Sequence, residues 1–278
     1  MDVNENIQSL ETLTFCSMRM SGATQNRRID SWSRKMESLA FGRLAINGLS
    51  ILRLTPESSC CAPVNGMQPW DLTSVCSLGR NLIETYLALH YFAQEDRTAQ
   101  ELELRKNVWE FHEASERFKM LRAGLSKSVR LPELQQNLAV CRRALEVDAS
   151  FQGLPKDKRQ LVLHGKLAKL LTCEELCASA GISTNYHTSM FKYGSNHTHS
   201  SPFSFAQLDS FNAGDESARQ VFRMPLHVST GFIALGIRDH LRLWPDQSGS
   251  MNADEKHLVR MWEDILKWDK NPWFTGSV

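Results

Sequence analysis

The sequence predicts an all-α protein, a helical bundle of about seven to nine helices without a substantial sheet. Only 15 glycines and nine prolines occur among 278 residues, fewer than turn-rich β architectures need. Apolar residues recur at three- and four-residue spacing, and no long run alternates with period two. Apolar residues (42%) and charged residues (23%) occur in ordinary globular proportions, which excludes a wholly disordered chain.

The pattern divides the chain into three segments. Residues 1–26 are rich in Ser, Thr, Asn and Gln without a sustained period, so we expect a flexible or docking extension there. Residues 27–245 carry the periodic helices and are expected to form one helical bundle domain. Residues 246–278 are expected to form a C-terminal amphipathic helix and tail.

Apolar periodicity, caps and prolines place the individual helices. Asp71 is expected to cap a central helix that is apolar on nearly every side and therefore buried. Thr172 and Glu175 form a capping box before a short helix that ends at Gly181. The expected helices span 32–54, 71–94, 98–127, a segment starting near 132, 158–171, 172–181, 183–200, 217–243 and 254–268, with a loop over 201–215.

Targeting signals and disulfide patterns are not recognisable in the sequence. No apolar run approaches the roughly 18 to 20 residues that span a bilayer, and the acidic, polar N-terminus lacks the features of a secretory signal. Seven scattered cysteines do not form the framework of a disulfide-rich secreted protein. We therefore expect a cytoplasmic protein with no membrane association and with reduced thiols.

The charge distribution is uneven although the formal net charge is only +1. Residues 97–169 hold 15 Lys and Arg against nine Asp and Glu. One interpretation is a helix surface laced with ion pairs, because Glu101/Arg105 and Glu113/Arg117 have the favourable i, i+4 spacing. The alternative is a face that binds a polyanion such as RNA, or a nucleotide.

Arg80 and Glu84 lie one turn apart on the predicted central helix. Charges on so apolar a helix must be paired or solvated, because an isolated buried ion costs several kcal/mol. The pair is either a structural ion pair or part of a functional cleft.

Residues 185–199 concentrate histidine, tyrosine and hydroxyl side chains. His197 and His199 diverge by about 200° on a helix, which argues against a shared metal ion. We predict no metal site and no cofactor. A continuous helix would have two faces, one with Lys192, Ser195 and His199 and the other, expected to be core, with Tyr186, Met190, Tyr193 and His197.

The pattern Arg80-x-x-x-Glu84, followed by Tyr193-x-Ser195-x-x-x-His199, resembles a family of uncharacterised, mainly bacterial all-helical proteins over roughly residues 35–245. Members look distantly like HEPN domains, helical bundles that include metal-independent ribonucleases of toxin and phage-defence systems. The usual signature of those ribonucleases is an Arg four to six positions before a His. The segment with His197 and His199 departs from it, because Lys192 stands where an Arg is expected. Arg159 and His164 elsewhere in the chain fit the spacing, but such matches are expected by chance.

Two functional hypotheses follow. In the first, the protein is a ribonuclease-like phosphodiesterase in which Arg80 binds phosphate, His199 is the acid or base and Glu84 orients them, with Tyr193 and Ser195 in the same polar cleft. In the second, a non-enzymatic helical module binds a partner protein or a small anionic ligand.

The C-terminal part of the sequence has several tryptophans, which are large apolar side chains that we expect to be covered by other residues. They either dock on the bundle or anchor a homodimer contact. These residues are Trp244, Trp262, Trp268 and Trp273.

Overall fold

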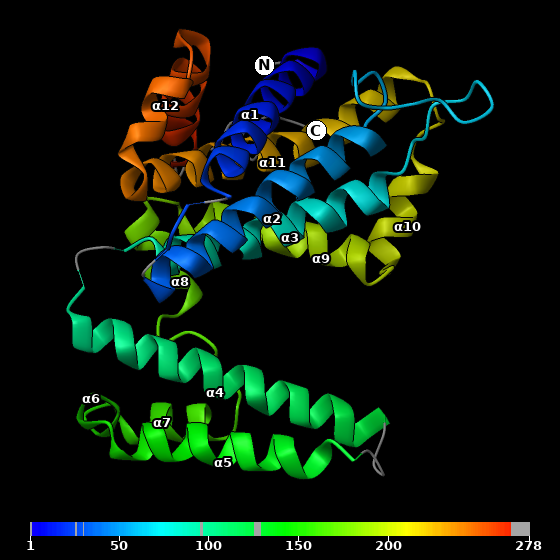
Figure 1. Cartoon of the computed structure of the whole chain (residues 1–278). Coiled ribbons are helices and arrows are strands. Elements are labelled where there is room, and N and C mark those ends of the chain that lie inside the picture. Colours follow the sequence, from blue (N-terminus) through cyan, green and yellow to red (C-terminus); the bar gives the residue numbers. More distant parts are fainter. Residues whose placement is uncertain (1, 26, 30, 95–96, 125–128, 268–278) are drawn as a thin grey trace. The chain divides into compact units, whose positions relative to one another are not determined.

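A computed structural model describes the chain except residues 1, 26, 30, 95–96, 125–128 and 268–278 (Figure 1). The predicted all-α class is confirmed, because the described residues form helices and only an isolated bridge between Val64 and Met67, with no strand. The helices outnumber the predicted seven to nine. They are α1 (Val3–Thr24), α2 (Trp32–Leu54), α3 (Leu72–Phe92), α4 (Ala99–Gly124), α5 (Leu131–Val147), α6 (Ala149–Gln152), α7 (Lys156–Leu163), α8 (Cys173–Ala180), α9 (Thr184–Thr198), α10 (Pro202–Asp209), α11 (Glu216–Leu243), the 3-10 helix η1 (Pro245–Ser250) and α12 (Ala253–Lys267).

The chain forms two compact units rather than the single bundle expected over 27–245. Unit 1 combines Met1–Ala93 with Cys173–Val278, and unit 2 comprises Gln94–Thr172. Unit 2 has its own apolar core, which includes Val108, Phe111 and Phe151. A segment that buries its own apolar side chains in this way has the character of a separate folding unit.

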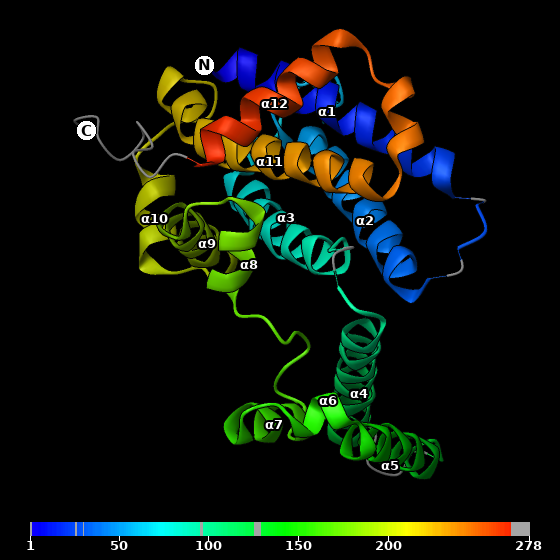
Figure 2. The ribbon, with the colours of Figure 1, turned by 90° about the vertical axis from the view of Figure 1, so that its left-hand side faces the viewer.

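Helix α3 is the centre of unit 1, as its apolar circumference predicts. It packs against α2, α11 and α9 (Figures 1 and 2). Leu82, Tyr86 and Leu89 are fully buried, and Asp71 caps the helix by accepting a hydrogen bond from the Ser74 backbone N–H at 3.0 Å. Asp71 therefore has the role that the sequence predicts for it.

The N-terminal segment forms helix α1 instead of a flexible extension, the first of the two alternatives predicted for residues 1–26. Asp2 and Glu5 form a capping box, and Leu10 and Leu13 are completely buried. The stripe that α1 buries also contains Asn6 and other polar residues, which interrupt the apolar period along the sequence. Helix α1 is part of the core of unit 1, where it contacts α2 and α11.

Two further elements differ from the prediction. Helix α10 occupies part of the expected loop over 201–215, and Pro202 at its first turn supplies the start signal. Helix α7 ends at Leu163 instead of continuing to 171. Gly165 follows with a φ of +63°, a backbone conformation that ends a helix.

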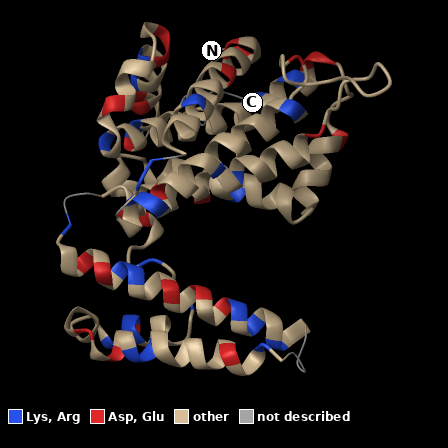
Figure 3. Cartoon of the chain, in the orientation of Figure 1, with Lys and Arg blue, Asp and Glu red and all other residues tan. Residues whose placement is uncertain are grey.

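The helices of unit 2 place most of their charged side chains toward solvent, although Arg105 on α4 is buried. Its core lies between α4, α5 and α6, and Figure 3 shows basic and acidic residues interleaved along α4. The ion pairs Arg105–Glu101 (3.0 Å) and Arg117–Glu113 (2.5 Å) are both present. The i, i+4 pairing predicted for these helices is confirmed.

The C-terminal helix α12 packs on α11 and α1. Trp262 is completely buried and Trp244 is 7% exposed, so both belong to the core of unit 1. Trp268 and Trp273 lie outside the described residues. Within the described part of the chain, no helix has both the length and the apolar character that crossing a membrane requires.

Candidate functional site

Arg80 lies where α3 faces α9. Its guanidinium carbon is 4.7 Å from the centre of the Phe191 ring, and its Nη2 donates to Glu84 Oε1 at 3.1 Å. The side chains of Arg80 and Glu84 are 24% and 51% exposed. Arg80 is therefore half-buried and Glu84 is exposed, so the pair is partly solvated rather than enclosed in the core.

Helices α3 and α9 approach each other most closely at Gly194. A Cβ atom at this position would lie 2.8 Å from the Arg80 Cβ and 3.1 Å from the carbonyl oxygen of Cys76. Such distances are too short for any larger residue without a shift of one helix. Gly194 thus lets α9 reach the backbone of α3 and brings the Phe191 ring to Arg80.

Tyr193 and His197 converge on one amide of α10. The Tyr193 hydroxyl donates to Gln207 Oε1 at 3.1 Å, and His197 Nε2 lies 2.7 Å from the same oxygen. Burial raises the pKa of Tyr193 well above its usual value and lowers that of His197, so both side chains stay neutral at pH 7. The prediction that these residues belong to the core face of the helix is confirmed.

The opposite face of α9 is open to solvent. Lys192 and His199 are exposed, and the Ser195 hydroxyl donates to the Phe191 carbonyl at 2.7 Å. Thr198 links the end of α9 to α3 through a hydrogen bond of 3.1 Å to the Ser77 hydroxyl. The two predicted faces of this helix are present, and Ser195 already has an acceptor in its own helix.

His199 follows the last residue of α9, next to Thr198, whose hydroxyl contacts Ser77 on α3. His199 is eight positions beyond Phe191, a rise of about 12 Å along α9 at 1.5 Å per residue. Among the described residues, no hydrogen bond or ion pair joins His199 to Arg80 or Glu84. The predicted convergence of the three side chains stays a prediction.

A buried polar network on the same helix α3 was not anticipated from the sequence. Tyr86 and His90 both contact Asp239 Oδ2 of α11, at 3.0 and 2.7 Å, and Arg238 Nε donates to Asp239 Oδ1 at 2.8 Å. Asp239 is completely buried. Tyr86 and His90 are one turn apart on α3, but nothing in the spacing of residues 86, 90 and 239 indicates that α11 supplies the carboxylate.

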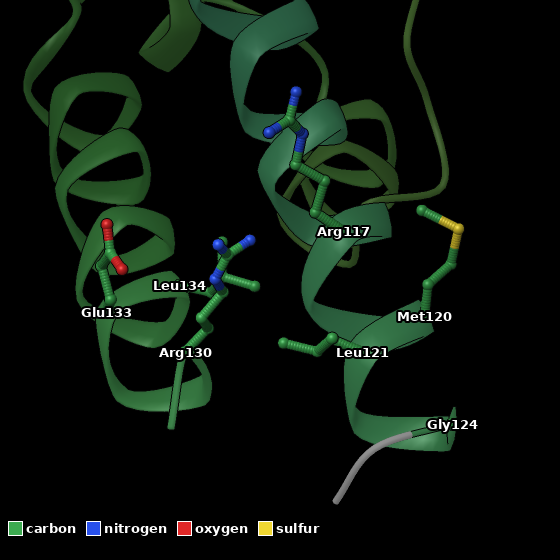
Figure 4. A pocket seen from close by; sticks show the side chains of 7 residues that line it. All are labelled: Arg117, Met120, Leu121, Gly124, Arg130, Glu133 and Leu134. Atoms are coloured by element: carbon green, nitrogen blue, oxygen red, sulfur yellow. The ribbon is translucent and has the colours of Figure 1, made fainter. Parts of the chain in front are cut away.

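Unit 2 contains a groove between α4 and α5, with a volume of about 600 Å³. Figure 4 shows the Leu121 side chain pointing from α4 toward α5, with Arg117 on α4 and Arg130 just before α5. The lining residues are Arg117, Met120, Leu121, Gly124, Arg130, Glu133 and Leu134. The groove combines an apolar floor with two guanidinium groups, an arrangement that suits an anion attached to a flat or apolar group.

Among the described residues, no three or more His, Cys, Asp and Glu side chains are arranged so that they could hold a metal ion. All seven cysteines are free thiols. Burial raises the pKa of Cys76, beneath Tyr193, far above its usual value. This thiol is therefore unionised and unreactive at neutral pH.

Comparison with known proteins gives one match. The model of a family of unknown function (DUF5677) matches residues 62–217, which is more than half of the chain. No curated protein and no solved structure matches. The matched region runs from the loop before α3 to the start of α11 and contains both helices of the Arg80 site.

Proposed function

The chain belongs to the DUF5677 family of unknown function, and we propose that it binds RNA at the α3–α9 face and cleaves it without a metal ion. The observation that supports this proposal is the state of Arg80. Its guanidinium is held by the Phe191 ring and by Glu84, yet a quarter of the side chain is exposed. A fixed, accessible guanidinium with unused N–H donors is the usual partner of a phosphate group.

The roles of the other residues follow from their positions. Glu84 and Phe191 hold Arg80, while Tyr193 and Ser195 stabilise α9 through their hydrogen bonds. His199 is exposed, so its imidazole is accessible to exchange a proton with a bound strand. A single-stranded RNA with one phosphate on Arg80 would extend along α9 toward His199.

The proposed reaction is transesterification within the RNA strand. His199 takes the proton from a ribose 2′-hydroxyl, and the 2′-oxygen attacks the adjacent phosphorus. The bond from phosphorus to the 5′-oxygen breaks, and the protonated His199 gives its proton to that oxygen. The products are a 2′,3′-cyclic phosphate and a 5′-hydroxyl, and His199 is neutral again.

Binding is measured by fluorescence anisotropy of a labelled single-stranded RNA over a range of salt concentrations. Arg80→Ala should weaken binding and lower the slope of log K against log salt by about one, because one phosphate contact is lost. Arg260→Ala is the matched control, since it removes one exposed positive charge from α12 of unit 1. If both variants lost the same RNA affinity, the effect would come from net charge alone. This result would contradict the assignment of Arg80 as a phosphate-binding residue.

Cleavage is measured on a radiolabelled RNA with and without EDTA. Wild-type protein should produce 2′,3′-cyclic ends in both conditions, and His199→Ala should lower the rate by about 100-fold or more. His257→Ala, which removes another exposed histidine, should leave the rate unchanged. Activity that disappears with EDTA, or that survives His199→Ala, would contradict the proposed chemistry.

A toxin or phage-defence role follows from the HEPN resemblance, for which the comparisons provide no match. Expression of the wild-type chain in bacteria should then slow growth, whereas His199→Ala should not. Equal growth with both proteins would remove this part of the proposal.

Unit 2 offers a second, independent contact for RNA or a nucleotide. The groove between α4 and α5 presents Arg117 and Arg130, within the stretch where basic residues exceed acidic ones. The double substitution of these two arginines to Ala should weaken nucleotide or RNA binding several-fold. The control is the double substitution of Arg142 and Arg143 to Ala, which removes the same charge from exposed positions outside the groove.

The alternative function is a non-enzymatic helical module for a partner protein or a small anion. It is favoured by the way Tyr193 and His197 share Gln207, because side chains that satisfy one another need no ligand. RNA-independent binding of inorganic phosphate at Arg80, together with no cleavage under any condition, would support this alternative over the ribonuclease.

A homodimer contact through the C-terminal tryptophans is now restricted to Trp268 and Trp273, because Trp244 and Trp262 are buried in unit 1. A chain ending at Lys267 keeps α12 and removes only those two tryptophans with the tail. Light scattering should show a lower mass for this variant if they form the contact. An unchanged mass would exclude it.

A further inference from the structure

Ser179, His90 and Asp239 form a continuous hydrogen-bonded chain across three helices of unit 1. The Ser179 Oγ on α8 lies 3.0 Å from His90 Nε2 on α3. The His90 Nδ1 lies 2.7 Å from Asp239 Oδ2 on α11. Ser179 is exposed, His90 is 3% exposed and Asp239 is fully buried. The order of groups and the distances are those of a serine nucleophile, its base and the carboxylate that orients the base.

Asp239 is a fixed and ionised acceptor. Burial by itself would raise its pKa, but the hydrogen bond from His90 and the charge of Arg238 lower the pKa to about 2. Tyr86 donates to the same carboxylate at 3.0 Å, and Arg242 lies 3.2 Å from it. An ionised carboxylate can only accept hydrogen bonds, so His90 carries its proton on Nδ1. The lone pair of a neutral His90 is then on Nε2, directed at Ser179.

The Ser179 hydroxyl can donate to either an imidazole nitrogen or a backbone carbonyl. One is His90 Nε2, and the other is the Leu176 carbonyl of its own helix, at 3.0 Å. When His90 is neutral, the hydroxyl can donate to Nε2 and become more nucleophilic. When His90 is protonated, Nε2 donates to Ser179, and the hydroxyl can turn to Leu176.

A fixed positive charge lies beside the Ser179 backbone. Arg238 Nη1 donates to the carbonyl oxygen of Ala180, the next residue, at 3.1 Å. The Arg238 side chain is 12% exposed and is held by Asp239 and Glu263. A guanidinium in this position is a candidate for stabilising an oxyanion formed at Ser179.

We propose that Ser179 is the nucleophile of a Ser–His–Asp site that accepts acyl groups from carboxylic esters. This site is distinct from the Arg80 site, because Arg80 and His90 are ten residues apart on α3, about 15 Å along the helix axis. The inference therefore does not depend on the proposed ribonuclease function.

The proposed reaction has two steps. The Ser179 oxygen attacks the ester carbonyl carbon, and His90 Nε2 takes the hydroxyl proton. The bond from carbon to the alcohol oxygen breaks, and that oxygen receives the proton from Nε2. Water then attacks the acyl-serine with His90 again as base, the carboxylic acid leaves, and the proton returns to the Ser179 oxygen.

The test uses the full-length chain, a fluorophosphonate probe and hydrolysis of p-nitrophenyl acetate. Peptide mapping should place the probe on Ser179, and Ser179→Ala should abolish both labelling and hydrolysis. Ser210→Ala is the matched control, because Ser210 is also exposed and also donates to a carbonyl three residues earlier, at 2.6 Å, but has no histidine partner. Absence of labelling, labelling at another residue, or equal labelling of Ser210 would overturn the proposal.

His90 needs a separate test because its substitution can affect folding. His90→Asn should lower the labelling rate by about 100-fold while the helical circular dichroism is unchanged. If that variant does not fold, Ser179→Cys provides the measurement without altering the core. Its thiol should react with iodoacetamide at pH 7 at least about tenfold faster than the thiol of Ser210→Cys, since His90 would hold it as a thiolate. Equal alkylation rates at the two positions would overturn the assignment of His90 as the base.

Discussion

Units 1 and 2 use helices of similar length but place polar side chains in opposite ways. Helix α11 of unit 1 buries 18 of its 28 residues, including Asp239 and His240. Helix α4 of unit 2 buries six of its 26 residues and forms ion pairs along its exposed side. Removing one partner of a polar pair should therefore cost more free energy of unfolding in unit 1 than in unit 2. In a buried site no water can replace the lost partner.

The largest loss of stability is expected when Glu37 on α2, in unit 1, is replaced. Glu37 and His240 are both completely buried, 2.7 Å apart, and Trp244 Nε1 donates to the same carboxylate at 3.1 Å. Glu37→Ala should lower the free energy of unfolding by about 3–5 kcal/mol, since it leaves a buried imidazole without its partner. Denaturant melts measure the loss, and hydrogen exchange by mass spectrometry assigns it to unit 1. A loss below about 1 kcal/mol would mean that the buried polar groups of unit 1 contribute no more to stability than the exposed ion pairs of unit 2.

Acid should weaken unit 1 through His227. Burial and the nearby charge of Arg223 lower its pKa from the ordinary 6.5 to about 4. The unfolded chain takes up a proton near pH 6.5, whereas the folded chain does so only near pH 4, so stability falls as the pH drops through this window. The expected loss is about 3 kcal/mol.

Urea melts at pH 7, 5 and 4 compare wild type with His227→Gln, which cannot titrate in this range. The variant should lose about 3 kcal/mol less than wild type between pH 7 and 4. The exposed His257→Gln should behave as wild type. Parallel pH profiles for wild type and His227→Gln would show that His227 is not the acid-sensitive group.

Unit 2 has its own sensitive position at Gly165. A Cβ there would lie 2.1 Å from the Ser115 hydroxyl oxygen and 2.7 Å from its Cβ, and φ is +63°. Gly165→Ala should destabilise unit 2 by about 2 kcal/mol through overpacking and backbone strain. Hydrogen exchange should increase in residues 94–172 and not in α11.

The control for this prediction is Gly214→Ala. Gly214 has a φ of +91°, and nothing lies within 4 Å of the point that a Cβ would occupy, so its substitution tests backbone strain without a steric clash. If Gly214→Ala lost as much stability as Gly165→Ala, backbone strain alone would explain both losses. The clash with Ser115 would then make no contribution.

The smallest effect is expected at Glu84, although it is on the central helix of unit 1. Its side chain is 51% exposed, similar to Glu113 in unit 2 at 50%. Glu84→Ala and Glu113→Ala should each cost less than about 1 kcal/mol, since exposed pairs are weak. Thermal melts of both variants test this, and a loss above about 3 kcal/mol for Glu84 alone would place the pair in a buried environment.

The candidate site was only partly predictable from the sequence. The helical period of α9 places Tyr193 and His197 on one face and Lys192 and His199 on the other. In the structure Tyr193 is half-buried and His197 is buried, whereas Lys192 and His199 are exposed. The partner of Tyr193 and His197, Gln207, was missed because it lies on α10, in a segment that the sequence predicts as a loop. The contact of Arg80 with Phe191 depends on the close approach of two helices at Gly194, which periodicity does not reveal.

The sequence by itself determined the all-α class, the central position of α3 and the ion pairs of α4, because these depend on neighbours within one helix turn or on the period of one helix. Tertiary structure decided that α1 joins the core despite its polar stripe, and that residues 94–172 form a unit of their own. It also brought Ser179, His90 and Asp239 together from α8, α3 and α11. Such contacts join residues 60 or more positions apart, and they are fixed by how helices pack against one another, which no local pattern encodes.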